Sequence, residues 1–137
     1  MQYQKNTVAA LLAVLIFVLS GYKSLAQSQT AMNMQAGSGY AKADKELNQV
    51  YQKILKEYAS KTQVIKNLKV AQRLWVQLRD AELAARYPKG GGYGSAQPMC
   101  ESLYLETLTR ERTKFLKVWL TGIPEGDVCT GAVKMSK

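Results

Sequence analysis

The stretch AQRLWVQLRDAE, residues 71–82, places apolar side chains and charges at the three- and four-residue steps of an α-helix. The same spacing continues before this stretch and includes Val64, Leu68, Ala71, Trp75, Leu78 and Glu82. It predicts one helix over residues 62–86, because positions so spaced share one helical face. Pro88 and the glycines at 90–92 end this helix, since proline and consecutive glycines interrupt helical backbone.

Similar spacing on either side predicts two more helices. The first covers residues 39–60 and has a face made of Tyr40, Asp44, Leu47, Tyr51, Ile54 and Tyr58. The third covers residues 99–120, stops before Gly122 and Pro124, and has a stripe of Leu105, Leu108, Arg112, Phe115 and Trp119. A very short turn joins the first two helices, so they should lie antiparallel. The expected fold is all-α, a small three-helix bundle.

Length and composition limit the chemistry. The chain has 137 residues, 47% hydrophobic and 21% charged, which suits one globular domain and is too short for two. It contains no histidine, so a histidine base, a Ser-His-Asp or Cys-His triad and a histidine-ligated zinc site are excluded. No nucleophile stands beside a convincing base. We therefore expect no cofactor, no metal site and no enzymatic activity.

The N-terminal residues have the pattern of an export signal. Lys5 precedes an uncharged apolar run at residues 8–19, and Ser24-Leu25-Ala26 offers small residues where a signal peptidase reads them. Cleavage of the signal, residues 1–26, leaves residues 27–137 as one helical domain. The alternative is an uncleaved anchor, but this apolar run is shorter than the roughly 20 residues that span a bilayer. We expect an exported protein, periplasmic or secreted, without a permanent membrane anchor.

Two cysteines, Cys100 and Cys129, make an intramolecular disulfide the expected state of an exported chain. The geometry is demanding, because Cys100 would begin the third helix and Cys129 would follow its end. That helix is about 30 Å long, so the tail must fold straight back along it, or the helix must begin later. An intermolecular disulfide is the alternative. The expected architecture is a bundle whose C-terminal tail is tied back by the disulfide.

The chain is basic, with 19 Lys and Arg against 10 Asp and Glu. Without Lys5 and Lys23 of the signal, 17 basic and 10 acidic side chains leave a formal charge of +7. Such a surface attracts anionic envelope polymers, nucleic acid or acidic partners. The lysines are spread along the helices, which favours a merely soluble basic surface. Anionic envelope polymers stay a candidate partner, and no nucleic acid partner is expected.

Polar side chains interrupt the apolar faces of the predicted helices. A buried charge must be paired and hydrogen-bonded, so an acid such as Asp44 should meet Arg79 or Arg112. The alternative treats Asp44, Asp80 and Glu82 as catalytic carboxylates of the glycosidase type. Asp80 and Glu82 are two residues apart on a helix and point away from each other, which favours a structural network. Its predicted members are Asp44, Asn48, Gln72, Arg73, Trp75, Arg79, Asp80, Thr109 and Arg112.

A glycine-rich loop at residues 90–98 is the candidate binding element, with Gly91, Gly92, Tyr93 and Ser95 as its contact residues. Glycines let a backbone approach another surface closely, and Tyr93 could anchor in a partner's cleft. The alternative, which we favour, is a connector whose glycines only permit the turn. A phosphate-binding loop is disfavoured, because no strand precedes the glycines and no Gly-Lys-Ser/Thr follows them.

An ordered set of motifs across residues 32–131 resembles the LprI-like lysozyme-inhibitor family of exported bacterial helical domains. The motifs are Met32-Asn33, YAKAD at 40–44, Leu47-Asn48 with Tyr51, AQRLW at 71–75, LRDAE at 78–82, the glycine-rich loop, Leu108-Thr109 with Arg112, and GDVC at 126–129 with Gly131. Many relatives carry a cysteine where this chain has Gln35 and another where it has Leu83. That pattern fits the loss of one disulfide.

The resemblance implies an exported binding protein that blocks a lysozyme or another envelope-degrading enzyme. Many c-type lysozymes are themselves basic, and a partner of charge +7 would be repelled by them at long range. The alternative is an envelope interaction or structural protein that does not inhibit and is held to anionic polymers by its lysines. Such binding would fall steeply with salt.

Overall fold

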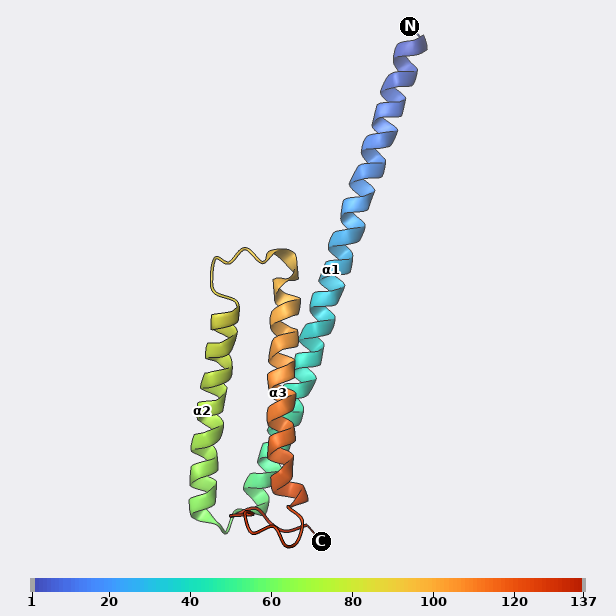
Figure 1. The fold of residues 1–137 in the computed structure, drawn as a ribbon. Coiled ribbons are helices and arrows are strands. Elements are labelled where there is room, and N and C mark those ends of the chain that lie inside the picture. The colour runs from blue at the N-terminus through green and yellow to red at the C-terminus, as the bar shows by residue number, and fades with distance from the viewer. Residues whose placement is uncertain (1, 137) are drawn as a thin grey trace.

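The computed structural model describes the backbone of residues 2–136 and the side chains of residues 28–136. Its three α-helices are α1 (Gln2–Glu57), α2 (Thr62–Arg86) and α3 (Gln97–Thr121), with a short 3₁₀ helix η1 (Gly94–Ala96) before α3. α1 and α3 run in the same direction, and α2 runs opposite to both (Figure 1). The predicted all-α fold with three helices is confirmed. Within residues 2–136 the β structure is limited to one isolated bridge, Ile123 to Met135.

The ends of α2 and α3 follow the sequence signals, whereas the predicted bounds of the first helix, 39–60, are wrong. α1 begins at Gln2, since no proline before residue 39 interrupts it, and it ends at Glu57. α2 has the predicted bounds, and the Tyr87 amide caps it by donating to the Leu83 carbonyl at 2.9 Å. α3 begins two residues before the predicted start, with proline in its first turn, where the missing N–H removes no helical hydrogen bond. It ends at Thr121, and Gly122, which follows, has a φ of +88°. There a side chain would meet the backbone of Ser136, so the close crossing of the tail requires glycine.

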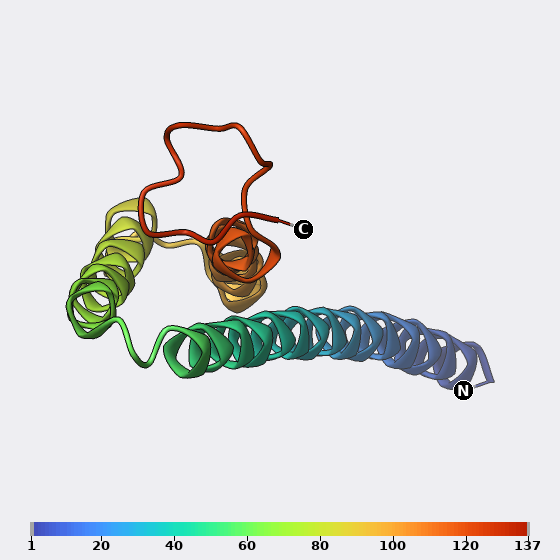
Figure 2. The same cartoon turned by 90° about the horizontal axis from the view of Figure 1, so that it is seen from below.

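The core lies where α1 and α3 pack side by side (Figure 2). Small residues lie at this contact: Ala43 is 1% exposed, and an added side chain at Gly39 would displace the flexible carboxylate of Glu106. Leucines, isoleucine, valine and tyrosine fill the contact, with one leucine from α2. The buried cluster is Leu47, Val50, Ile54, Tyr58, Leu68 and Leu116.

An ion-pair group also joins α1 to α3. Glu46 accepts a hydrogen bond from Lys117 Nζ at 2.6 Å and lies 3.7 Å from Arg110. The bonded Lys117 ammonium lowers the pKa of the Glu46 carboxyl. Because the group is exposed to solvent, it adds little to stability, and what it adds is lost as the pH falls through that lowered pKa.

α2 stands away from the other two helices. It contacts α3 only sparsely and does not pack closely along α1, although it is antiparallel to α1 as predicted (Figure 2). Its buried residues are Leu68 and Gln72, whereas Leu74 and Leu78 are 55% and 56% exposed. The bundle is therefore more open than the sequence predicts.

The buried face of α3 also differs from the predicted stripe. Phe115 is 62% exposed, while Thr109, Thr113 and Leu116 are buried. Thr109, Thr113 and Leu116 are four and three residues apart, so they share the face of α3 that packs on α1, whereas Phe115 lies off that face. The hydroxyl of Thr113 bonds to the Thr109 carbonyl at 2.8 Å, so it needs no partner across the interface.

The predicted disulfide is absent, because Cys100 and Cys129 are both free thiols. Cys100 lies in the first turn of α3, and about 30 Å of helix separates it from the C-terminal end. The tail does not fold back along α3. It crosses the end of the bundle toward the turn between α1 and α2, where Lys61 Nζ donates to the Ala132 carbonyl at 3.4 Å (Figure 1). Cys129 is thus held away from Cys100.

Tyr58 holds the tail in place of a disulfide. Its hydroxyl donates to the Trp119 carbonyl at 2.9 Å and accepts from the Lys134 amide at 3.0 Å. The ring is 3% exposed and meets Trp119 edge to face, with centroids 5.4 Å apart. A single buried hydroxyl therefore joins the end of α1, the end of α3 and the tail.

Tyr58→Phe is expected to lower the free energy of unfolding by about 2 kcal/mol, because it leaves a partly buried carbonyl and amide without partners. Urea unfolding followed by circular dichroism measures the change. The control is the double variant Cys100→Ser, Cys129→Ser, which should change the free energy of unfolding by less than about 0.5 kcal/mol. Adding a reductant to the parent protein should have an equally small effect. A loss of several kcal/mol in the serine variant would mean that a disulfide does hold the tail.

The predicted signal peptide, residues 1–26, lies outside the residues whose side chains are described, and it stays a prediction. Across residues 28–136, no helix combines the length and apolar character that crossing a membrane requires.

Candidate functional site

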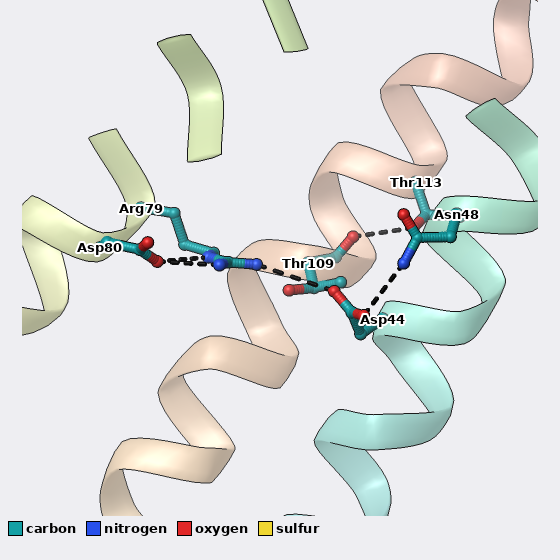
Figure 3. A network of polar contacts seen from close by, with 6 residues as sticks. All are labelled: Asp44, Asn48, Arg79, Asp80, Thr109 and Thr113. Atoms are coloured by element: carbon teal, nitrogen blue, oxygen red, sulfur yellow. Dashed lines mark hydrogen bonds and ion pairs between the residues drawn. The ribbon is translucent and has the colours of Figure 1, made fainter. Parts of the chain in front are cut away.

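The polar network centres on Arg79, which projects from α2 toward α1 (Figure 3). Its Nε and Nη2 donate to Asp80 Oδ1 at 2.9 and 2.8 Å, and its Nη1 lies 3.8 Å from Asp44 Oδ1. Asn48 Nδ2 donates to Asp44 Oδ2 at 3.0 Å. The Arg79 side chain is 11% exposed, so the two carboxylates neutralise a cation that has lost most of its water.

Aromatic rings complete the environment of Arg79. The guanidinium carbon lies 5.3 Å from the centroid of the Trp75 ring and 6.0 Å from that of Tyr40. Both distances suit an attraction between a cation and a π-system. Burial raises the pKa of Tyr40, while the Arg79 charge opposes that shift.

A second arginine, Arg112 of α3, faces α2 from the other side. Its Nε donates to Gln72 Oε1 at 3.0 Å, and its guanidinium lies 5.6 Å from the Trp75 ring and 5.3 Å from the Phe115 ring. Burial lowers the pKa of Arg112. Trp75 thus lies between two arginines, one paired with carboxylates and one bonded only to an amide.

Two predicted members of the network behave differently. Arg73 is exposed and makes no polar contact with the described side chains. Thr109 is fully buried, and its hydroxyl has no hydrogen-bond partner within the described residues. The sequence predicted Arg73 as a member of the network because it is close to Trp75 along the chain, but its position on the helix directs its side chain into solvent. The structure therefore brings together Asp44, Asn48, Arg79 and Asp80, and separately Gln72 and Arg112, with Trp75 between the two groups.

Tyrosines at the other end of α2 form a cluster that sequence reasoning missed. Tyr87 lies edge to face with Tyr93 and Tyr104, with centroids 5.6 and 6.4 Å apart. Arg86 stacks over Tyr104 at 4.5 Å. The signal available in the sequence was the spacing of Arg86-Tyr87 and Tyr93 around the glycine loop, which is too irregular for a helical face.

The glycine loop is folded back on this cluster. Gly90, Gly92 and Gly94 have φ of +83°, +66° and +67°, a region that other residues rarely adopt. The ring of Tyr93 packs against Gly91, where any side chain would collide with it. Asn33 Nδ2 donates to the Ser95 carbonyl at 3.1 Å and ties the loop to α1. Tyr93 is 42% exposed, so it is positioned by the fold and still accessible.

The carboxylates of Asp44 and Asp80 have the contacts of the predicted structural network, and Glu82 makes no contact with them among the described residues. Asp44 and Asp80 are 42% and 59% exposed and contact the same guanidinium, whereas the general acid of a glycosidase lies in an apolar pocket. Among the described residues no group of three Asp, Glu or Cys side chains is placed to hold a metal ion. These contacts are those of a network that fixes the position of α2.

The fold and these contacts define a small helical domain with a layer of arginines and aromatic rings between its helices. The chain belongs to the Lysozyme inhibitor LprI family, whose sequence profile matches residues 22–116. This confirms the family resemblance, although the match stops before the GDVC motif of the tail. An uncharacterized protein of Rhizobium meliloti (strain 1021) is 38% identical over 105 residues, which cover 67% of this chain and 73% of that protein. No solved structure matches the chain.

Proposed function

We propose that the protein is an exported inhibitor that binds a lysozyme or another enzyme that degrades the bacterial envelope. Membership of the Lysozyme inhibitor LprI family is the observation that carries this proposal. The apolar run at residues 8–19 supports export to the periplasm or the medium. The protein acts by binding, without a cofactor and without chemistry of its own.

The glycine loop is the proposed contact surface. It joins α2 to α3, and the positive φ values of its glycines together with the Asn33–Ser95 bond give it a defined shape before binding. A loop already ordered loses little conformational entropy on association. Tyr93 would enter the cleft of the enzyme, supported from behind by Tyr87. Its exposed side is the part available to a partner.

Charge favours acidic or neutral target enzymes. With the signal removed, the chain carries 17 basic and 10 acidic side chains, and it repels strongly basic lysozymes at long range. Inhibition of an acidic enzyme should weaken as salt rises, because screening removes the steering term. Inhibition of a basic enzyme would require a local acidic patch at the contact.

The test is inhibition of basic, neutral and acidic lysozymes by residues 27–137 at two salt concentrations. Stoichiometric, saturable inhibition of one enzyme is the expected result. Tyr93→Ala should weaken it about 30-fold, the effect of removing an anchor worth about 2 kcal/mol. Gly91→Ala should act in the same direction, because the added methyl displaces the Tyr93 ring.

Phe115→Ala is the matched control, since Phe115 is an exposed aromatic residue on another part of the surface. It should inhibit as well as the parent. Equal inhibition by the parent and by Tyr93→Ala would exclude the loop as the contact surface. No inhibition of any enzyme in the panel would overturn the proposed function itself.

Exposed lysines support the second candidate, an envelope protein that binds anionic polymers without inhibiting an enzyme. Lys42, Lys45, Lys53 and Lys56 are exposed along α1, and within the described residues none of them forms an ion pair. Binding to an anionic wall polymer should then fall steeply with salt and tolerate Tyr93→Ala. Binding that ignores salt would exclude this candidate.

A further inference from the structure

An apolar groove lies between α2 and α3, at the end of the bundle where the tail crosses. Its volume is about 410 Å³, within the range of small-molecule sites and near its lower limit. Ala132 of the tail closes one end. The other lining residues include Val64, Leu68, Ala71, Phe115, Trp119 and Arg112. The groove exists because α2 stands away from α3, so that the rings of α3 are left uncovered on this side.

Arg112 supplies the positive charge in the lining. Its Nε is bonded to Gln72, and its guanidinium lies close to the Trp75 and Phe115 rings. No carboxylate of the described residues lies within ion-pair distance, in contrast to Arg79, which has two. Among the described residues only the Nε of Arg112 has a hydrogen-bond partner, so its Nη groups have none, and a guanidinium binds a carboxylate best through two parallel hydrogen bonds.

The charge and the apolar lining are arranged along one axis. Arg112 and Trp119 are seven residues apart on α3, about 10 Å along the helix. The antiparallel α2 places Ala71 at the Arg112 end and Val64 at the Trp119 end. A ligand that lies in the groove thus meets a cation at one end and a mainly apolar surface toward the tail, where Asn67 is the one polar lining residue among those described.

We propose that this groove binds a free single-chain aliphatic carboxylate, with its carboxylate on Arg112 and its alkyl chain along Leu68 and Phe115 toward Trp119. The single unpaired guanidinium fits one anionic head group, and the volume fits one medium-length chain. Binding would cover the exposed face of Phe115 and pair the charge that the fold leaves without a carboxylate. The proposal does not depend on lysozyme inhibition.

Tryptophan fluorescence tests it directly, because the chain has two tryptophans near the site: Trp119 lines the groove, and the Trp75 ring lies against the Arg112 guanidinium. Titration of residues 27–137 with decanoate, below its micelle concentration, should shift the emission saturably with one ligand per chain. Each methylene added from octanoate to dodecanoate should tighten binding by up to roughly fourfold. Decanol, with the same chain and no charge, should bind at least about tenfold more weakly.

Arg112→Met keeps the apolar stem and removes the charge. It should therefore lower the affinity for decanoate at least about tenfold and leave the affinity for decanol unchanged. Arg73→Met removes a charge that lies outside the groove and should leave both affinities unchanged. Phe115→Ala, at an exposed position that tolerates truncation, should weaken both ligands. The Phe115 variant thus still tests binding in the groove if the Arg112 variant does not fold.

Three results would overturn the proposal. The first is no saturable shift with decanoate, including the case in which sedimentation shows the groove closed by a second copy of the chain. The second is equal affinity for decanol and decanoate in the parent protein. The third is binding to anionic phospholipid vesicles without binding to free decanoate, which would assign the face to a membrane surface.

Discussion

Leu116→Ala is expected to lower the free energy of unfolding by about 3 kcal/mol, the usual cost of truncating a fully buried leucine. Leu116 is 0% exposed and lies in the buried cluster with Leu47, Ile54 and Tyr58. Truncation would leave a cavity at the α1–α3 contact, where the close-packed helices have little room to relax. Urea unfolding followed by circular dichroism gives the value.

The neighbouring residue provides the control. Phe115→Ala removes a larger side chain, yet Phe115 is 62% exposed and should change the stability by less than about 1 kcal/mol. The contrast tests the rotation of α3 about its axis, because the hydrophobic pattern alone places Phe115 inside. Equal losses from the two variants, or a larger loss from Phe115→Ala, would show that α3 packs with the predicted face.

Arg79→Met is expected to lower the free energy of unfolding by about 2 kcal/mol, through loss of charge-assisted hydrogen bonds and of contacts with two aromatic rings. Methionine preserves much of the apolar stem, so the change isolates the guanidinium. Without it, α2 loses its link to Asp44 of α1 and the cation between Tyr40 and Trp75. The carboxylates of Asp44 and Asp80 stay partly in water, which limits the loss.

Arg73→Met is the matched control for the Arg79 variant, with the same substitution on the same helix. Arg73 is exposed and without a polar contact to the described side chains, so its replacement should stay within about 0.5 kcal/mol. If both variants lose the same amount, net charge rather than the contacts of Arg79 accounts for the effect.

The number of helices and the bounds of α2 and α3 could be read from the sequence, but α1 runs from Gln2 to Glu57 where residues 39–60 were predicted, and the buried face could not be read in full. Proline and glycine signals placed the ends of α2 correctly and those of α3 within two residues. The face of α3 was missed because Thr109 and Thr113 are buried for their small size, whereas Phe115 and Trp119 carried the hydrophobic pattern. A periodicity argument weighs hydrophobicity and does not register how closely a second helix approaches.

The contacts of the candidate site could also be predicted only in part from the sequence. The pairing partner of Asp44 was narrowed to two arginines, and the structure places Arg79 beside it. Arg73 has the same residue type and lies near Trp75, but only the helix rotation decides that it faces solvent. The disulfide was expected from compartment and cysteine number, which take no account of where the tail goes after Gly122.

The wide separation in sequence between α1 and α3 has a consequence for the order of folding. Their contacts join residues as far apart as Glu46 and Lys117, 71 positions, so an entropically costly loop must close before the main interface forms. Before α1 and α3 have packed together, α2, which lies between them in the sequence, has little apolar surface against which to pack. α2 should therefore dock after the α1–α3 interface has formed. The long arginine and aromatic side chains of this region suit that step, because they can bridge the distance between α2 and the helices that are already packed.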